Sequence, residues 1–250
     1  MLILLDIGNT SVTSALYEGG RLHSFRSFVH YDIPKNVKKL LLCGRDTKTC
    51  HIVISSVVPK ITSYLAKNLR KQKNIRLWIV NTNLPLSIKH NYWNYNKLGA
   101  DRAVNIYGAL KIHKPPMLVI DFGTAITADY ISKKGVFEGG MIIPGPEIAF
   151  QALVSRAALI SKKVRLPKKA KSFLGVTTYD CMSSGILQGY GAMVDALVER
   201  FRKRYGRNLR VLATGGFATH LRPYTHAFDI VDPQHSIKSL LLLFKTSRVK

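Results

Sequence analysis

The chain opens with an alternation of apolar and polar segments that predicts β-structure. Residues 2–5 form an apolar run that ends at a carboxylate, Asp6. Residues 11–16 and 21–28 then alternate between apolar and polar side chains, with Gly19 and Gly20 between them. This pattern predicts a buried strand followed by a meander of two further strands.

The same order of segments returns in the middle of the chain. Residues 117–120 are apolar and end at Asp121, and residues 126–131 and 136–143 follow as two more strand candidates. The strings LLDIGNTSVT and VIDFGTAITA align without gaps and place Asp6 opposite Asp121. So short a string can repeat by chance, but the matching strand–turn–strand context favours two similar halves.

Helix and strand candidates alternate through the rest of the chain. Further strands are predicted at 51–58, 76–80 and 209–213, and helices at 61–71, 98–113, 146–160, 179–205 and 234–244. Such alternation predicts an α/β fold with mixed sheets covered by helices. We expect an N-terminal half at 1–114 and a C-terminal half at 115–250, and the last helix could pack back on the first half.

The composition is that of a folded protein, with 46% hydrophobic and 21% charged residues. The longest apolar runs, 1–5 and 240–244, are far shorter than the roughly 20 residues of a membrane span. The N-terminus also lacks the features of a secretory signal. Cys43, Cys50 and Cys181 form no CxxC pair, so we expect reduced thiols and a cytoplasmic protein without a structural metal.

The charge is strongly positive, because 38 lysines and arginines face 14 acidic residues and give a net charge of +24. The basic runs are 35–39, 67–73, 162–171 and 200–210. They can be solvated helix faces, or they can attract polyanions without sequence preference. Few aromatic residues lie among them and no groove-reading motif is present, so we expect no specific nucleic-acid partner and no membrane partner.

The turn after the first strand has the residue types of a phosphate site. Gly8 lets the backbone approach a ligand closely, and turn amides can point at phosphate oxygens. Asn9, Thr10 and Ser11 add side-chain donors, and Asp6 is placed to hold a cation or its water. A strand that ends in Asp-x-Gly also occurs in ordinary turns, but the second copy at Asp121 favours the phosphate interpretation.

Two further segments are candidates for chemistry. Asp101 and Arg102 begin a predicted helix, where Asp101 can complement the helix dipole or accept a hydroxyl proton beside an anion-binding arginine. Gly215 and Gly216 follow a strand, where they can form an ordinary turn or admit a flat nucleotide group. A Walker A loop is excluded at 140–145, because Pro146 occupies the position of its lysine, and neither GxGxxG nor GxSxG occurs.

Taken together, the motifs resemble those of type III pantothenate kinases, a family that also includes Bvg-accessory-factor-like proteins. The matching segments, in chain order, are 6–10 (DIGNT), 54–59 (ISSVVP), 99–102 (GADR), 121–125 (DFGTA), 139–145 (GGMIIPG), 182–186 (MSSGI) and 213–216 (ATGG). The resemblance covers nearly the whole chain. It implies the actin/sugar-kinase/Hsp70 fold, in which two ribonuclease-H-like halves enclose an interdomain nucleotide cleft. It also implies ATP, Mg²⁺, a monovalent cation (K⁺ or NH₄⁺) and a homodimer.

The resemblance also implies roles for individual residues. Asp101 matches the proton acceptor, Asp6 lies near the Mg²⁺ of ATP, and Asp121 matches the monovalent-cation ligand. ATP contacts fall on Asp6, Ile7, Gly8, Asn9, Thr10, Ser11, Val12, Thr13 and Thr124, and pantothenate contacts on Tyr92, Gly99, Ala100, Asp101, Arg102 and Thr178. Tyr95 stands where the family usually has proline, and Ile126 where it usually has threonine, so we expect a weakened ATP contact.

The function implied is phosphorylation of the primary hydroxyl of pantothenate by ATP, the first step towards coenzyme A. Two alternatives stay open: a transcription-accessory or nucleic-acid-associated member of the same fold family, and a kinase of another small hydroxy acid. Retention of Asp6, Asp101 and Asp121 argues against a purely non-enzymatic role, because a scaffold needs none of them.

Overall fold

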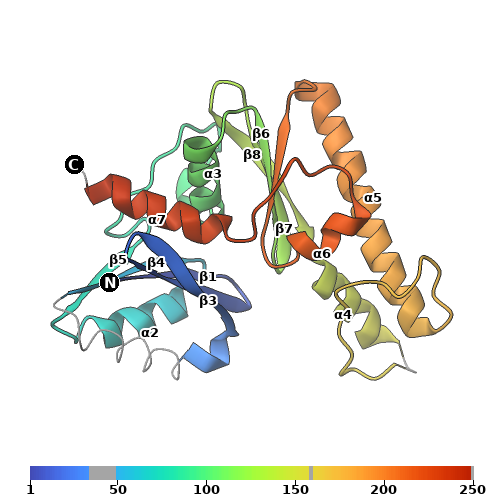
Figure 1. Cartoon of the computed structure of the whole chain (residues 1–250), viewed down its shortest axis with the longest axis horizontal. Helices are drawn as coiled ribbons and strands as arrows, with labels where there is room; N and C mark the ends of the chain where they lie inside the picture. The colour runs from blue at the N-terminus through green and yellow to red at the C-terminus, as the bar shows by residue number, and fades with distance from the viewer. Residues whose placement is uncertain (34–48, 158–159, 249–250) are drawn as a thin grey trace. The chain divides into compact units, whose positions relative to one another are not determined.

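The computed structural model describes residues 1–33, 49–157 and 160–248, and it divides into two compact units. The first unit comprises Met1–Ile88, Trp93–Ile112 and His235–Lys250, and the second comprises Lys89–Tyr92 and His113–Gln234. The main segment of the second unit therefore begins next to the expected boundary at residue 114, while the last helix belongs to the first unit. Figure 1 labels most of the helices and strands of both units.

The first unit is built on a five-stranded mixed sheet with the order β3-β2-β1-β4-β5. Its strands are β1 (Leu2–Ile7), β2 (Ser11–Glu18), β3 (Arg21–Val29), β4 (Cys50–Ser56) and β5 (Ile75–Ile79). The first three form the predicted antiparallel meander, and β4 pairs in parallel with both β1 and β5. A 3₁₀ turn, η1 (His30–Asp32), follows β3.

Helices cover this sheet and explain why β1 is apolar on both faces. Helix α2 (Pro59–Leu69) buries Leu65 and Leu69 against strand residues such as Ile52, and its proline suits a first helical turn. Helix α3 (Ala100–Ile112) packs against α7 (His235–Arg248), and the two contact β4 and β1 (Figure 1). A strand covered on both faces needs a continuous apolar run, as residues 2–5 provide.

The second unit repeats this plan. Its sheet has the order β10-β9-β6-β7-β8, which is the same sequence of antiparallel and parallel pairings. The strands are β6 (Met117–Phe122), β7 (Ala125–Ile131), β8 (Phe137–Pro144), β9 (Arg210–Thr214) and β10 (Ile230–Val231). The predicted internal repeat is confirmed: Asp6 and Asp121 end equivalent strands, and each pairs across the turn with a threonine, Thr13 or Thr127.

Two helices dominate the second unit. Helix α5 (Thr178–Tyr205) packs Val194, Val198 and Phe201 on the sheet, and α4 (Pro146–Arg156) packs against α5. Thr177 caps α5 by accepting a hydrogen bond from the Asp180 amide at 3.1 Å. A short helix, α6 (Ala218–Leu221), leads into η3 (Arg222–Tyr224), and η2 (Tyr95–Lys97) precedes α3 in the first unit.

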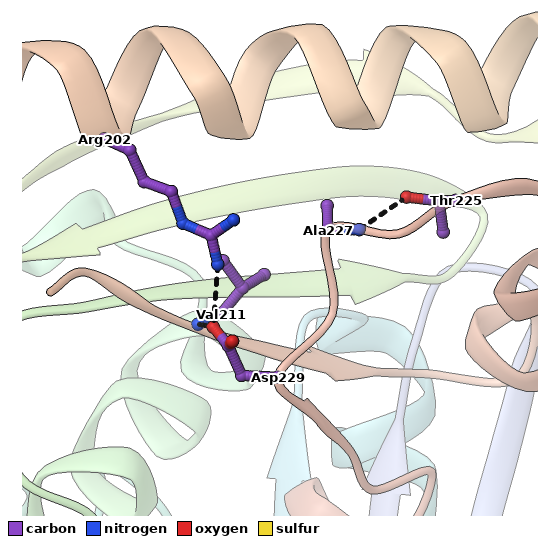
Figure 2. Close-up of polar contacts among 5 residues, drawn as sticks. All are labelled: Arg202, Val211, Thr225, Ala227 and Asp229. Atoms are coloured by element: carbon purple, nitrogen blue, oxygen red, sulfur yellow. Dashed lines mark hydrogen bonds and ion pairs between the residues drawn. The ribbon is translucent and has the colours of Figure 1, made fainter. Parts of the chain in front are cut away.

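The Asp229 carboxylate ties α5 to the sheet, as Figure 2 shows. Arg202 reaches from α5 to Asp229, with Nη2 at 3.1 Å from Oδ2, and the same oxygen accepts the Val211 amide of β9 at 2.7 Å. Beside it, the Ala227 amide donates to the Thr225 hydroxyl at 3.2 Å. Part of the basic run 200–210 therefore has a structural role in the second unit.

The strands and helices expected from the pattern are confirmed, with ends shifted by a few residues. The two-residue strand β10 was not expected, because two residues show no periodicity. The basic run 35–39 and Cys43 lie outside the described residues. No helix in the described ranges is long and apolar enough to cross a membrane.

Candidate active site

The first turn, between β1 and β2, is closed by its own backbone. The Gly8 amide donates to the Ser11 carbonyl at 3.0 Å, and Asn9 and Thr10 are exposed at the tip. Ile7 and Val12 point into the core, so the sheet anchors both sides of the turn. Exposed amides and hydroxyls on a rigid base are what a phosphate-binding turn requires.

Asp6, at the end of β1, has a strongly shifted pKa. Burial, together with the negative charge of Asp101, raises the pKa of Asp6 to about 6, although hydrogen bonds from the Ser236 and Ser55 hydroxyls oppose the shift. Its Oδ1 atom is buried and has no hydrogen-bond partner among the described residues. A buried carboxylate oxygen that accepts no hydrogen bond is energetically unfavourable, and a bound cation would offset that cost.

Asp101 lies in the first turn of α3 and is also largely buried. The Arg102 amide donates to its Oδ1 atom at 2.7 Å. Burial raises the pKa of Asp101, while that hydrogen bond and the positive charge of Arg102 act in the opposite direction. A carboxylate whose pKa is raised is a stronger base and is suited to accept a hydroxyl proton.

Gly99 makes room for this carboxylate. A Cβ atom at this position would collide with Asp101 Oδ1 and would lie 3.3 Å from the Val57 side chain. The Gly99 carbonyl accepts the Ala103 amide at 3.0 Å and so begins α3. The motif at 99–102 thus combines a space requirement with a helix start, which explains its residue types.

The structure brings Asp6 and Asp101 into electrostatic contact and adds two residues that sequence reasoning missed. Ser55 lies opposite Asp6 in the parallel pairing of β1 and β4, and Ser236 belongs to the first turn of α7. Ser55 falls inside the recognised segment 54–59, although no role had been assigned to it. For Ser236 the sequence carries no signal, because its place depends on the packing of α7.

The donor set fits a magnesium ion bound together with a nucleotide. Within the described ranges, no group of three or more His, Cys, Asp or Glu side chains could hold a metal alone. Mg²⁺ in nucleotide enzymes keeps waters and needs only one or two carboxylates besides the phosphates. Asp6 would supply one such carboxylate, and its buried, unpartnered Oδ1 atom is the observation that favours the fit.

The second turn, between β6 and β7, is surrounded by close-packed backbone. Gly215 has a φ of +89°, and a Cβ atom there would strike the Asp121 carboxylate and lie 2.7 Å from the Phe122 backbone. From the other side, the Gly145 amide donates to the Thr124 carbonyl at 3.1 Å. The segments 139–145 and 213–216 therefore both pack against the turn 121–125, the first at Thr124 and the second at Asp121.

The departure at Ile126 has a packing explanation. Its side chain is buried in the core of the second unit, among residues such as Ile120 and Val211. The next residue, Thr127, pairs with Asp121 on the neighbouring strand and is only partly buried. An apolar side chain at position 126 therefore fits the core without removing a hydroxyl from beside Asp121.

The remaining candidates lie apart from Asp101 along the chain and belong to the second unit. Tyr92 stacks on Phe137, with ring centroids 5.6 Å apart and 27° between the planes. Thr178 is exposed at the first residue of α5. Tyr95, the other departure from the family pattern, lies in the first unit and donates its hydroxyl to the Leu86 carbonyl at 3.4 Å.

Comparison with known proteins places these features in one family. The model of the type III pantothenate kinase family matches residues 2–200. The chain belongs to the type III pantothenate kinase family. The match spans the two turns, the segment 99–102 and most of α5, and it ends before β9 and α7.

Solved structures agree on the fold. A Campylobacter jejuni protein assigned to the Baf family of transcriptional activators is 23% identical, with a TM-score of 0.60, and the comparison covers 99% of this chain and 100% of that one. Component A of (R)-2-hydroxyglutaryl-CoA dehydratase from Acidaminococcus fermentans is 14% identical, with a TM-score of 0.51 over 99% of this chain and 98% of that one. Together with the duplicated sheets, these similarities confirm the actin/sugar-kinase/Hsp70 type of fold.

The family establishes the general chemistry. It is a family of kinases, which supports an ATP-dependent phosphoryl transfer with a divalent metal for this member. In such a transfer the protein contributes mainly position and charge neutralisation, and the two turns and the buried carboxylates are suited to both.

Proposed function

We propose that the protein transfers the γ-phosphoryl group of ATP to the primary hydroxyl of pantothenate, forming 4′-phosphopantothenate for coenzyme A synthesis. The observation that carries the proposal is the pairing of two partly buried carboxyls, Asp6 beneath the first turn and Asp101 at the start of α3. Phosphoryl transfer needs one carboxyl near the phosphates to bind the metal ion and another near the acceptor hydroxyl to take its proton.

The environment of each residue supports the role that we propose for it. The turn 8–11 binds phosphate oxygens through backbone amides and hydroxyls, with Ile7, Val12 and Thr13 fixing its base. Asp6 would hold Mg²⁺, which supplies charge neutralisation when bound. Asp101 accepts the hydroxyl proton as the oxygen–phosphorus bond forms and ADP departs, and Arg102 offsets the carboxylate of the substrate.

The second unit contributes the other proposed contacts. Asp121 binds the monovalent cation and Thr124 contacts ATP, supported by the carbonyl-rich surroundings that Gly145 and Gly215 create. Tyr92 and Thr178 contact pantothenate. We also propose a homodimer, since Phe173, Leu174 and Val176 expose 73%, 75% and 87% of their surfaces before α5.

We place the protein in the cytoplasm, where ATP is available and the thiols Cys50 and Cys181, both free in the structure, stay reduced. The partners proposed are therefore ATP, pantothenate and a second copy of the chain.

One coupled assay tests the proposal. ADP release is measured with pantothenate, with a panel of other small hydroxy acids and with no acceptor, each with and without K⁺ or NH₄⁺. We expect turnover with pantothenate that depends on the cation. Turnover with another hydroxy acid alone would move the function to that substrate.

The transcription-accessory alternative is favoured only by the charge of +24 and the Baf-family relative. Binding to duplex and single-stranded DNA is measured from low to physiological salt, with scrambled competitors. We expect weak binding without sequence preference that is lost as salt rises. Tight binding to one sequence at physiological salt would favour the alternative.

A further inference from the structure

A histidine far along the chain contacts the first phosphate turn. His30 stands at the start of η1, just after β3, and its Nε2 atom lies 2.8 Å from the Gly8 carbonyl oxygen. A carbonyl oxygen only accepts hydrogen bonds, so Nε2 must carry the proton and donate. The contact joins residues 22 positions apart and ties the end of the meander to the turn.

The contact sets the direction of a neighbouring amide. The Gly8 carbonyl and the Asn9 N–H belong to one planar trans peptide unit, in which the two groups point in opposite directions. When His30 draws the carbonyl to its side, the Asn9 N–H is directed to the other. Among the described residues this N–H has no hydrogen-bond partner, whereas the Gly8 N–H is already bound to Ser11.

This direction matters for an anion. A carbonyl oxygen that faced a phosphate would repel it, and an N–H that faces a phosphate attracts it. The Gly8–Asn9 peptide has the freedom to rotate, because glycine tolerates most backbone angles and the turn tip is exposed. Without an anchor, the peptide could present either its carbonyl or its N–H to the ligand.

We propose that His30 is a positioning residue of the phosphate turn: its Nε2–H holds the Gly8 carbonyl away from the nucleotide and directs the Asn9 N–H towards the phosphates. The inference rests on the proposed function only in taking a nucleotide as the ligand of this turn. It does not depend on the identity of the acceptor. None of the family motifs recognised in the sequence includes His30.

Variants of matched size separate this role from simple packing. His30→Gln keeps a side-chain N–H donor, and His30→Met has similar length without one. The control is His23→Ala, because His23 is exposed on β3, the strand that precedes His30, and its ring forms a hydrogen bond with the neighbouring Ser24 hydroxyl at 2.9 Å. Binding of a non-hydrolysable ATP analogue with Mg²⁺ is measured by calorimetry without acceptor, and kcat and KM are measured separately for ATP and pantothenate.

We expect His30→Met to weaken the analogue about five- to tenfold, the effect of one hydrogen bond, while KM for pantothenate stays within about twofold. His30→Gln should recover most of the affinity, and His23→Ala should match the wild type. In ¹⁵N-labelled protein, the Asn9 amide resonance should shift on addition of the analogue in the wild type and His30→Gln, and shift much less in His30→Met.

Several results would overturn the inference. His30→Met with unchanged analogue affinity, or a folded His30→Gln no better than His30→Met, would show that the hydrogen bond does not orient the turn. If His30→Met fails to fold, the wild type provides the test. An Asn9 amide resonance that does not shift when the analogue is added would contradict the inference. The two proposals can also fail separately. If the His30 variants change analogue binding as expected but the wild type does not phosphorylate pantothenate, the proposed function is refuted and this inference stands.

Discussion

The two turns of this protein share one architecture and differ in what surrounds them. Asp6 and Asp121 end equivalent strands in sheets of the same order, and each faces a threonine across its turn. Around Asp6, the helices α3 and α7 bring a second carboxylate and a hydroxyl. Around Asp121, two glycines bring backbone instead. The two units therefore share one arrangement of strands, and the helices and loops around each sheet make the two turns chemically different.

The difference in surroundings explains the roles we propose. Two neighbouring carboxyls repel each other when both are ionised. Binding of a divalent ion, or uptake of a proton by one of them, relieves this repulsion. A turn lined by carbonyls and one carboxylate has less charge to offset and suits a monovalent cation. The following changes test this comparison, beginning with the largest expected effect.

Removing the carboxylate of Asp101 should abolish the chemistry of the first unit. Asp101→Asn keeps the size and the helix start but cannot accept a proton, so we expect kcat to fall about 10²–10⁴-fold with the fold and pantothenate affinity retained. Glu147→Gln is the control, because Glu147 is also a first-turn helix carboxylate. Activity near the wild-type level in Asp101→Asn would reduce Asp101 to a charge at a helix end.

Removing the carboxylate of the second turn should act on the cation and not on proton transfer. We expect Asp121→Ala to lose activation by K⁺ or NH₄⁺ and to bind ATP more weakly. The measurement is initial rate against cation concentration at saturating pantothenate. A response curve equal to that of the wild type would place the cation elsewhere in the protein.

Neutralising Asp6 should stabilise the metal-free protein above pH 6. Because burial raises the pKa of Asp6 from 3.8 to about 6, the folded state holds this proton more tightly than the unfolded state. The contribution of Asp6 to stability is therefore favourable at low pH and is lost as the pH rises through about 6. We expect Asp6→Asn to raise the free energy of unfolding by about 1–3 kcal/mol at pH 8 and by little at pH 4.

Urea unfolding of the metal-free Asp6→Asn and wild-type proteins at several pH values measures this difference. We expect the same variant to lose activity with Mg-ATP, so that its higher stability is accompanied by a loss of function. A difference in stability that does not change with pH would contradict the assigned environment of Asp6.

The last prediction concerns the backbone beside Asp121. Gly215→Ala introduces a side chain at positive φ and against the Asp121 carboxylate, so we expect a loss of about 1–3 kcal/mol in unfolding free energy. Gly216→Ala is a matched control, because a Cβ atom there meets nothing within 4 Å. Equal stability of the two variants would mean that the turn yields freely and does not constrain Asp121.

Periodicity and turn chemistry identified most elements of this fold in advance. Side-chain periodicity predicts the meander at 2–29, its repeat from residue 117 and the helices. Exposure to the core or to solvent repeats every two residues in a strand and every 3.6 in a helix. The motif at 99–102 was also visible, since a glycine and a first-turn acid at a helix start are local features. The ends of elements and the two-residue β10 depend on partners that lie elsewhere in the chain.

The sequence by itself determined the duplicated plan and the family, and it also pointed to three candidate carboxylates, because all of these are encoded by local patterns or short motifs. What only the tertiary structure decided was their surroundings. The helix α7 comes from the far end of the chain to put Ser236 beside Asp6, and β3 delivers His30 to the Gly8 carbonyl. Electrostatic and hydrogen-bond effects act over a few ångströms in space, so residues distant in sequence set them.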